Sequence, residues 1–169
     1  RGIGREIALK AAALGANIVI AAKSAEPHAK LPGTIHSVAA EVEEAGGKAL
    51  ALQLDVRDEN AVKAAMAQAA EHFGGIDALI NNAGAIKLVG VEKLDPKRFD
   101  LMFQINTRAV MVCSQAALPY LKDSRGHILS LSPPLNLDPK WFANYGPYTT
   151  TKYGMSMLTL GMHEEFKKY

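Results

Sequence analysis

The sequence predicts an α/β fold with a doubly wound parallel sheet of the Rossmann-like type, in three α/β/α layers. Continuous apolar runs of strand length alternate with segments of helical periodicity along the whole chain. Strands of a parallel sheet are buried on both faces, so they form unbroken apolar runs rather than alternating patterns. With 169 residues, 49% apolar and 21% charged, the chain suits one globular domain over residues 1–169.

Helices are indicated by apolar stripes and by residues that begin or end helices. The first helix follows the opening RGIG directly, places Ile7, Ala11 and Leu14 on one stripe, and ends at Gly15. The remaining helices are expected at 34–47 with Thr34 as N-cap, at 58–75 with Asp58 as N-cap, at 96–121 behind Asp95-Pro96 and with a bend near Asn106, and from Tyr148 onward.

The apolar runs between these helices are the expected strands, at 17–22, 48–56, 76–84 and 126–132. The segment 133–147 holds four prolines and is expected to be a loop. Ligands of open parallel sheets bind beyond the carboxyl ends of the strands. The residues that follow each strand are therefore the candidate site.

Composition argues against several classes of function. A net charge of +2, with no Lys/Arg run beside stacking aromatics, gives no reason to expect nucleic acid. The single cysteine, Cys113, excludes an internal disulfide and lies in an apolar segment where we expect it to be buried. The five histidines lack ligand spacing, so no metal site is expected, and no apolar run has the length of a membrane span.

Glycines and cations in the first part of the chain indicate a dinucleotide. Gly2 and Gly4 directly precede a helix, where a backbone can approach a pyrophosphate, although a plain glycine turn has the same pattern. An acidic residue at the end of the second strand of such a fold selects NAD, whereas Lys23 stands there and Arg1 flanks the glycines. The two cations predict a 2′-phosphate, hence NADP(H) before NAD(H). The alternative for Lys23 is a solvated surface residue.

The next two strand ends carry polar or small residues. Asp55 could accept a hydrogen bond from an adenine amino group, or it could cap the following turn. The stretch NNAG at 81–84 suits a flat ring lying against backbone, and it also fits ordinary turn chemistry.

The last strand and the helix after it carry hydroxyl groups beside a lysine. Tyr148 and Lys152 are four residues apart and share one helix face. A phenol with a pKa near 10 is too weak an acid for neutral pH, but a fixed ammonium favours the phenolate and lowers that pKa. The tyrosine can then exchange a proton with an alcohol oxygen. A serine hydroxyl at the strand end, Ser130 or Ser132, can hydrogen-bond the same oxygen.

Taken together, these motifs resemble those of the classical short-chain dehydrogenase/reductases. RGIG is similar to the second half of their phosphate loop, NNAG to their fourth-strand motif, Asn106 to the asparagine of their catalytic tetrad, and YTTTK to their Tyr-x-x-x-Lys. The resemblance covers essentially the whole chain. Residues 21–35, 132–136 and 147–166 resemble the hydroxysteroid-dehydrogenase-like branch more closely.

The resemblance implies an NADP(H)-dependent oxidoreductase that transfers hydride between the nicotinamide and a secondary alcohol, a ketone or an aldehyde of lipid-like character. The implied catalytic residues are Tyr148 as proton donor or acceptor, Lys152, Ser132 and Asn106, the last through a relay water. The implied cofactor-binding residues are Arg1, Gly2, Ile3, Gly4, Lys23, Asp55, Val56, Asn82, Ala83, Gly84, Tyr148 and Lys152.

The serine position departs from the family pattern. The common form ends the fifth strand with two serines, whereas this chain has Ser132-Pro133, so that the usual catalytic position aligns with Pro133. Ser132 is the remaining hydroxyl, and Asn136 on the following loop is a substitute donor.

The resemblance also implies features of the whole molecule. The family's first strand and its C-terminal strands have no counterpart here, so we expect this piece not to fold stably alone. The last helix is apolar around most of its circumference, at Met155, Met157, Leu158, Leu160 and Met162, and is expected to be buried on more than one side. The helices at 96–121 and 148–166 are expected to pair in a homodimer or homotetramer. A cytoplasmic location is expected, with an organelle such as the peroxisome left open.

Two other functions are compatible with the same motifs. A non-catalytic dinucleotide-binding regulator would keep the fold and lose turnover. An epimerase or dehydratase of nucleotide sugars would hold NAD tightly, although the compact loops argue against it.

Overall fold

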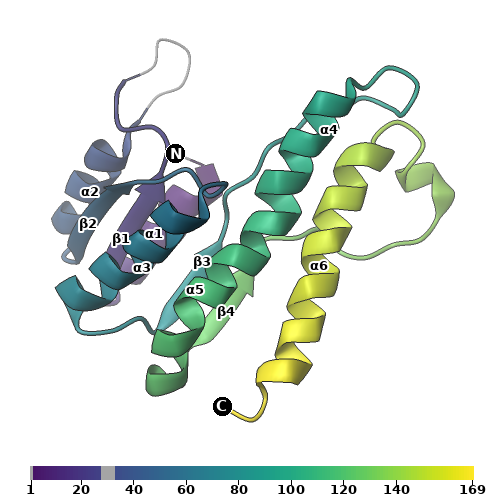
Figure 1. Cartoon of the computed structure of the whole chain (residues 1–169). Helices are drawn as coiled ribbons and strands as arrows, with labels where there is room; N and C mark the ends of the chain where they lie inside the picture. Colours follow the sequence, from purple (N-terminus) through teal and green to yellow (C-terminus); the bar gives the residue numbers. More distant parts are fainter. Residues whose placement is uncertain (1, 28–32) are drawn as a thin grey trace. The chain divides into compact units, whose positions relative to one another are not determined.

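The computed structural model describes residues 2–27 and 33–169, which form helices and parallel strands as predicted (Figure 1). The chain divides into two compact units, Arg1–Ile76 and Asp77–Tyr169. Each unit contains a two-stranded parallel sheet with its own helices. The predicted α/β class is therefore confirmed.

The first unit follows the predicted alternation of helix and strand. The sheet pairs β1 with β2 in parallel, from Asn17 opposite Lys48 to Ala22 opposite Gln53. In chain order its elements are α1 (Gly2–Ala12), β1 (Asn17–Ala22), α2 (Ile35–Glu44), β2 (Lys48–Gln53) and α3 (Glu59–Phe73). The second strand ends before Asp55, earlier than expected, which leaves that residue in the turn beyond the sheet edge.

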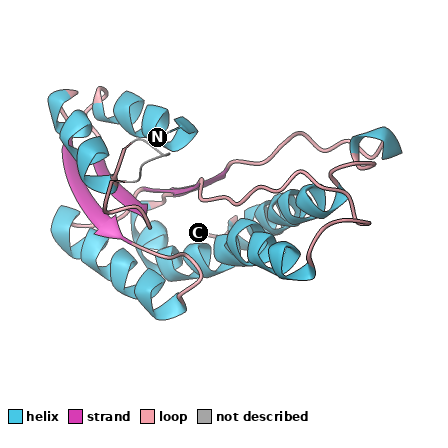
Figure 2. Cartoon of the chain, turned by 90° about the horizontal axis from the view of Figure 1, so that it is seen from above, coloured by secondary structure: helices cyan, strands magenta, loops and turns pink. Residues whose placement is uncertain are grey.

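Helices cover both faces of this sheet (Figure 2). The core beneath α1 and α2 centres on Ala8, Ala12 and Val42 and takes in Ile18 and Ile20 of β1. The small alanines allow α1 to lie close to its neighbours.

The predicted apolar stripe of α1 was wrong. The helix ends at Ala12, so Leu14 falls in the turn behind it and is 78% exposed. The buried side of α1 is instead marked by Ala8 and Ala12. The helix packs through these two small residues, which a count of large apolar side chains overlooks.

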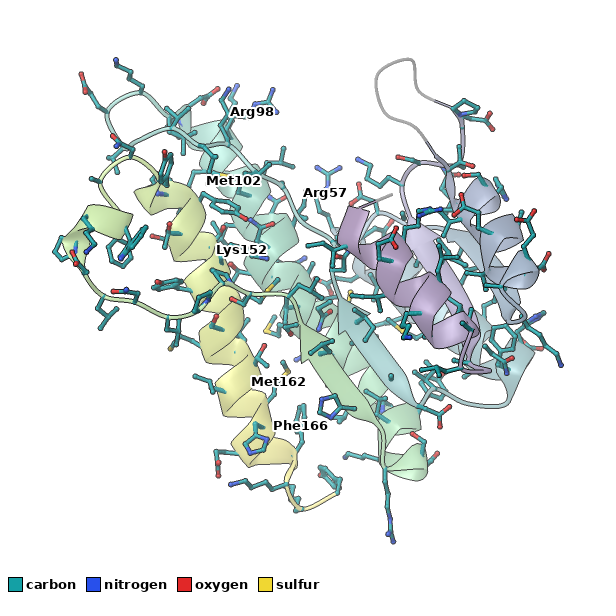
Figure 3. The ribbon with its side chains drawn as sticks, turned by 180° about the vertical axis from the view of Figure 1, so that it is seen from behind. Arg57, Arg98, Met102, Lys152, Met162 and Phe166 are labelled. Carbon is teal, nitrogen blue, oxygen red and sulfur yellow. The ribbon has the colours of Figure 1, made fainter. Side chains whose placement is uncertain are left out.

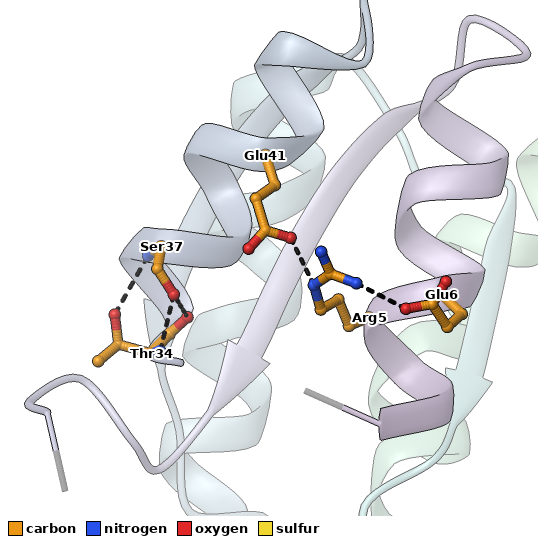
Figure 4. A network of polar contacts seen from close by, with 5 residues as sticks. All are labelled: Arg5, Glu6, Thr34, Ser37 and Glu41. Atoms are coloured by element: carbon orange, nitrogen blue, oxygen red, sulfur yellow. Dashed lines mark hydrogen bonds and ion pairs between the residues drawn. The ribbon is translucent and has the colours of Figure 1, made fainter. Parts of the chain in front are cut away.

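Polar contacts at helix ends fix where the helices of the first unit begin. Thr34 accepts a hydrogen bond from the Ser37 amide at 3.1 Å, and the Ser37 hydroxyl accepts one from the Thr34 amide at 2.9 Å (Figure 4). Asp58 caps α3 through the amides of Asn60 and Ala61, both at 3.0 Å. Both predicted N-caps are confirmed.

The second unit pairs β3 with β4 in parallel, from Ala78 opposite His127 to Asn81 opposite Ser130. Its elements are β3 (Ala78–Asn81), α4 (Pro96–Phe103), the π-helical turn η1 (Gln104–Arg108), α5 (Ala109–Ser124), β4 (His127–Ser130), the 3-10 turn η2 (Pro139–Trp141) and α6 (Gly146–Phe166). Asp95 caps α4 by accepting from the Lys97 amide at 3.0 Å, as predicted. Helix α6 begins two residues before Tyr148, with Pro147 in its first turn.

Helix α4, the turn η1 and helix α5 form one helical run that α6 follows along its length (Figure 1). The predicted irregularity near Asn106 is confirmed, because η1 places a π-turn there. Opposite this turn, α6 carries Gly154. A methyl group added to Gly154 would lie 2.8 Å from Thr107 Cγ2, so the absence of a side chain allows the two helices to meet closely.

Within this single chain α6 leaves part of its apolar surface exposed, so its expected burial on more than one side stays a prediction. Met155 is fully buried, but Met157 is 53% and Leu160 is 57% exposed. The helix packs on η1, α4, α5 and β4, and these elements cover one side of it. Across residues 2–27 and 33–169, none of the helices combines the length and apolar character needed to cross a membrane.

We predict opposite effects on stability for two glycine substitutions in α6. In the intact protein, Gly154→Ala should lower the free energy of unfolding by about 1–3 kcal/mol, since its methyl group overpacks against Thr107. Gly161→Ala, where nothing lies within 4 Å, should raise it by up to about 1 kcal/mol through better helix propensity. Denaturant titration measures both. Equal effects of the two substitutions would contradict the close contact at Gly154.

Candidate active site

Tyr148 and Lys152 lie on the first turns of α6, four residues apart. Both side chains are half-buried. Within the described ranges the Tyr148 hydroxyl makes no hydrogen bond, so it is available to a ligand. The helix therefore presents a phenol and an amine at the point where the 133–145 loop enters it.

The Lys152 ammonium lies against the end of strand β4. Lys152 is labelled on α6 in Figure 3. Its Nζ donates to the Leu131 carbonyl oxygen at 2.5 Å and approaches Met155 Sδ at 3.6 Å. Burial disfavours the charged form and lowers the pKa of Lys152. The hydrogen bond to the Leu131 carbonyl holds the amine of Lys152 beside the end of β4. A bound ligand could accept a further hydrogen bond from the same group there.

Ser132 is hydrogen-bonded to the same helix. Its hydroxyl donates to the Lys152 carbonyl oxygen at 3.0 Å and also forms a short contact with the Ser156 hydroxyl. The side chain of Lys152 on α6 thus bonds to the end of β4, and the side chain of Ser132 after β4 bonds back to α6. The Ser132 hydroxyl has a single proton, so it must release the Lys152 carbonyl before it can donate to a substrate.

Asn106 is fully buried in the π-turn and connects three segments. Its Oδ1 accepts from the Ala85 amide at 2.8 Å. Its Nδ2 donates to the Ala85 carbonyl at 2.9 Å and to Thr151 Oγ1 at 2.9 Å. The side chain therefore connects the loop after β3, at Ala85, to helix α6, at Thr151, which directly precedes Lys152. A relay water would have to use the second lone pair of Oδ1 or the main chain.

Two threonines complete this contact, and sequence reasoning missed both of them. Thr107 Oγ1 donates to the Thr151 carbonyl at 2.7 Å, and Thr151 Oγ1 donates to the Tyr148 carbonyl at 2.7 Å. Both threonines are buried. The signal was present in YTTTK, whose last threonine lies between the two expected catalytic residues, but no spacing rule identified its partner.

The two adjacent asparagines after β3 differ in environment. Asn81 is buried, and its Nδ2 lies 3.5 Å from both Ser114 Oγ and Ser130 Oγ. Asn82, Ala83 and Gly84 are exposed beyond the strand. The predicted cofactor-binding residues beyond β3 are therefore accessible to a ligand. Asn81, the last residue of β3, is part of the internal packing.

The candidate phosphate-binding residues of the first unit lie at the start of α1. Gly2 has a φ of 64°, a left-handed conformation that favours glycine. Because α1 begins at Gly2, the amides of Gly2, Ile3 and Gly4 are among the first of the helix, which have no partner within it. Ile3 is exposed and Gly4 is half-buried. Arg1 lies outside the described residues.

The predicted NADP residues Lys23 and Asp55 come together beyond the carboxyl ends of β1 and β2. Lys23 Nζ lies 3.3 Å from Asp55 Oδ2, and its side chain is 62% exposed. Arg57, labelled in Figure 3, was not identified by sequence reasoning. It donates from Nη2 to Asp55 Oδ2 at 2.5 Å and from Nε to both carboxylate oxygens. Hydrogen bonding to Arg57 holds the pKa of Asp55 well below its ordinary value, with Lys23 adding to the effect.

Asp55 also caps its own turn, because its Oδ1 accepts from the Arg57 amide at 3.1 Å. This is the structural alternative that the sequence left open. Val56 beside it is half-buried. The cluster of Lys23, Asp55 and Arg57 has one more positive than negative charge, so it can still receive an anion.

Metal ligands do not gather in the described ranges: no group of three or more His, Cys, Asp or Glu could hold an ion there. Cys113 is buried, as predicted, and burial raises the pKa of its thiol to about 11.

The sequence of this chain matches known proteins. The short chain dehydrogenase family model matches residues 1–169. Hydroxysteroid dehydrogenase-like protein 2 of Xenopus laevis is 59% identical over 168 residues, and that of Homo sapiens is 58% identical; each match covers 99% of this chain and 40% of the relative. The chain thus spans less than half of these relatives.

Solved structures agree with the sequence comparison. A short chain dehydrogenase of Mycobacterium thermoresistibile superposes with a TM-score of 0.95 at 51% identity, over 99% of this chain and 60% of that one. A metagenomic short-chain oxidoreductase in complex with NADP superposes with a TM-score of 0.87 at 28% identity, over 99% of this chain and 73% of that one. From its motifs, its fold and these matches, the chain belongs to the short-chain dehydrogenase family.

Proposed function

We propose that the intact protein is an NADP(H)-dependent oxidoreductase that interconverts an alcohol and a carbonyl compound. The observation that carries this proposal is the pair Tyr148 and Lys152 on α6, with the lysine amine held beside the end of β4. Membership of the short-chain dehydrogenase family supports the same chemistry.

In the proposed reduction, the Tyr148 hydroxyl donates its proton to the carbonyl oxygen of the substrate, and in oxidation the phenolate takes that proton back. The nicotinamide supplies or accepts the hydride. Lys152 lies on the same helix face as Tyr148, one turn further on, where a positive charge can stabilise the phenolate that forms during turnover.

A second donor to the substrate oxygen comes from Ser132 or Asn136. Ser132 is nearer to Lys152, but its hydroxyl already donates to the Lys152 carbonyl. Asn136 Oδ1 accepts from the Asp138 amide at 2.9 Å, which orients its side chain and leaves the NH2 group to donate. We propose Ser132 for this role if it exchanges partners when substrate binds, and Asn136 otherwise.

Lys23 supports NADP(H) as the cofactor. The residue after β1 is a cation, and no acidic residue of β1 competes for a ribose hydroxyl. The carboxylate of Asp55 neutralises part of the positive charge of Lys23, but Arg57 adds a second positive charge to the cluster. A metagenomic short-chain oxidoreductase of the same fold was solved with NADP, which agrees with this choice. By family resemblance we assign pyrophosphate binding to the amides of Gly2, Ile3 and Gly4 in the first unit, and binding of the nicotinamide ribose to Asn82, Ala83 and Gly84 in the second.

We predict that Lys23→Gln weakens NADPH binding to the intact protein by about tenfold, because one charge-assisted contact to the 2′-phosphate is lost. Binding of NADH should stay unchanged. Fluorescence titration with both nucleotides measures the ratio. Lys48→Gln, at the opposite end of the same sheet, is the matched control and should affect neither nucleotide. A wild-type preference for NADH would contradict the assignment of Lys23.

The loops around Tyr148 support an apolar, lipid-like substrate. Leu135, Leu137 and Trp141 are exposed on the 133–145 loop, with Leu137 at 81%. The loop after β3 adds Ile86, Leu88 and Val91, and its Gly90 lies against Ala143, whose carbonyl oxygen would be 3.7 Å from an added methyl group. Two adjacent loops thus expose apolar side chains, and one of them leads directly into the helix that carries Tyr148. Each buried methylene of a substrate would contribute about 0.8 kcal/mol.

Replacing Tyr148 by Phe tests the reaction itself. NADPH-dependent reduction of decanal by the intact protein should fall by about 10²–10⁴-fold, since the general acid is removed. The dissociation constant of NADPH should stay within about threefold. Tyr120→Phe on α5 is the control and should leave turnover unchanged. Undiminished turnover in Tyr148→Phe would remove Tyr148 from the mechanism, and binding without turnover in the wild type would favour a non-catalytic regulator.

We also propose that the protein is a homo-oligomer that pairs through the helical run 96–124 and α6. Apolar side chains on these helices are partly exposed, including Phe103, Met111, Met157 and Leu160. Such exposure on neighbouring helices is typical of an interface.

Light scattering of the intact protein should therefore give the mass of a dimer or a tetramer. Leu160→Glu should shift it towards the monomer, because a charge would be buried in the interface. Gly161→Ala, on the same helix, is the matched control and should leave the mass unchanged. A monomeric wild type would contradict the proposal.

A further inference from the structure

Tyr153, the residue after Lys152, connects α6 to the 133–145 loop. Its hydroxyl accepts a hydrogen bond from the Asn136 amide at 2.8 Å and donates to the Asn136 carbonyl at 2.9 Å. The Pro134 carbonyl, 3.5 Å away, is a second acceptor. One phenol therefore satisfies both main-chain groups of a loop residue.

The ring of Tyr153 holds a second point of the same loop. The Phe142 ring packs against it in a T-shaped arrangement, with centroids 5.7 Å apart and planes at 84°. Such pairs add stabilisation beyond the apolar area that they bury. Asn136 and Phe142 stand at two places along the loop, so one side chain restricts the path of the residues between them.

Other polar contacts of this loop in the described chain are local. The Asp138 amide bonds to Asn136 Oδ1 at 2.9 Å, the Lys140 amide to Asp138 Oδ1 at 3.1 Å, and the Phe142 amide to the Pro139 carbonyl at 3.0 Å. These bonds shape the loop without fixing its position on α6. Tyr153 supplies side-chain contacts that hold the loop on α6, while Ala143 and Asn144 lie against Gly90 of the loop after β3.

The loop fixed in this way ends at Tyr145, where the helix that carries Tyr148 begins. It also exposes Leu135, Leu137 and Trp141. A change in the loop's position would move these apolar side chains and leave Lys152, held separately by Leu131, in place. Substrate affinity and proton transfer thus depend on different contacts.

We propose that Tyr153 is a positioning residue that holds the 133–145 loop beside Tyr148 and so determines the affinity for the apolar part of the substrate. This inference rests on the proposed oxidoreductase function. Tyr153 takes no part in proton transfer, since both hydrogen-bonding roles of its hydroxyl are used by Asn136. The substrate it helps to bind is a carbonyl compound or alcohol with an extended apolar chain.

The test is Tyr153→Phe in the intact protein, which keeps the ring and removes the hydroxyl. With NADPH as reductant, KM for decanal should rise by about tenfold, since two hydrogen bonds that hold the loop are lost. The dissociation constant of NADPH should stay within about twofold, and so should kcat where Ser132 rather than Asn136 donates to the substrate oxygen. Amide hydrogen exchange at Asn136 should become faster, since its amide loses its acceptor. Tyr120→Phe is the control for removal of a tyrosine hydroxyl elsewhere.

The possible outcomes separate this inference from the proposed function. A wild type that reduces decanal, with a variant unchanged in KM and in Asn136 exchange, would overturn the role of Tyr153 alone. A loss of kcat and NADPH affinity together with KM would also overturn it, because it would indicate general structural damage. A wild type that reduces neither decanal nor acetaldehyde would overturn the proposed function and this inference with it.

Discussion

The buried side chain of Asn106 is the contact on which the second unit depends. It pairs with both main-chain groups of Ala85 and with the hydroxyl of Thr151, and it is fully buried. A buried amide that lost one of these partners would leave a polar group unsatisfied, which is more costly than the bond itself is stabilising. The loop after β3, the π-turn and the first turns of α6 are therefore fixed together, and so are the residues proposed for catalysis.

The end of β4 combines structural and catalytic contacts in the same groups. Lys152 donates to the Leu131 carbonyl, and Ser132 donates to the Lys152 carbonyl. Each bond stabilises the packing of strand and helix. Each also occupies a group that the proposed reaction requires, the amine of Lys152 in the first and the hydroxyl of Ser132 in the second. Pro133 in the position of the second serine makes this conflict sharper, because Ser132 must serve both purposes or leave the second one to Asn136.

Charge in the first unit is distributed in a similar way. Asp55 stands between Lys23 and Arg57, and its pKa is lowered mainly by the hydrogen bonds of the guanidinium. An anion that approached Lys23 would compete with the carboxylate of Asp55, while Arg57 could keep that carboxylate paired. Selection of a 2′-phosphate would therefore depend on Lys23, Asp55 and Arg57 acting together, where the sequence indicated Lys23, Arg1 and the absence of an acid.

The sequence by itself determined the features that depend on neighbouring residues. The alternation of strands and helices, the caps at Thr34, Asp58 and Asp95, and the irregular turn near Asn106 all follow from local periodicity, hydrogen bonding and backbone preference. The shared helix of Tyr148 and Lys152 follows from their spacing. The tertiary structure decided what these residues contact: Arg57 on Asp55, Thr151 under Asn106, Tyr153 on the loop at Asn136, the exposure of Leu14 and the uncovered side of α6. These contacts join segments far apart in the chain, and no local pattern determines which distant partner a side chain will meet.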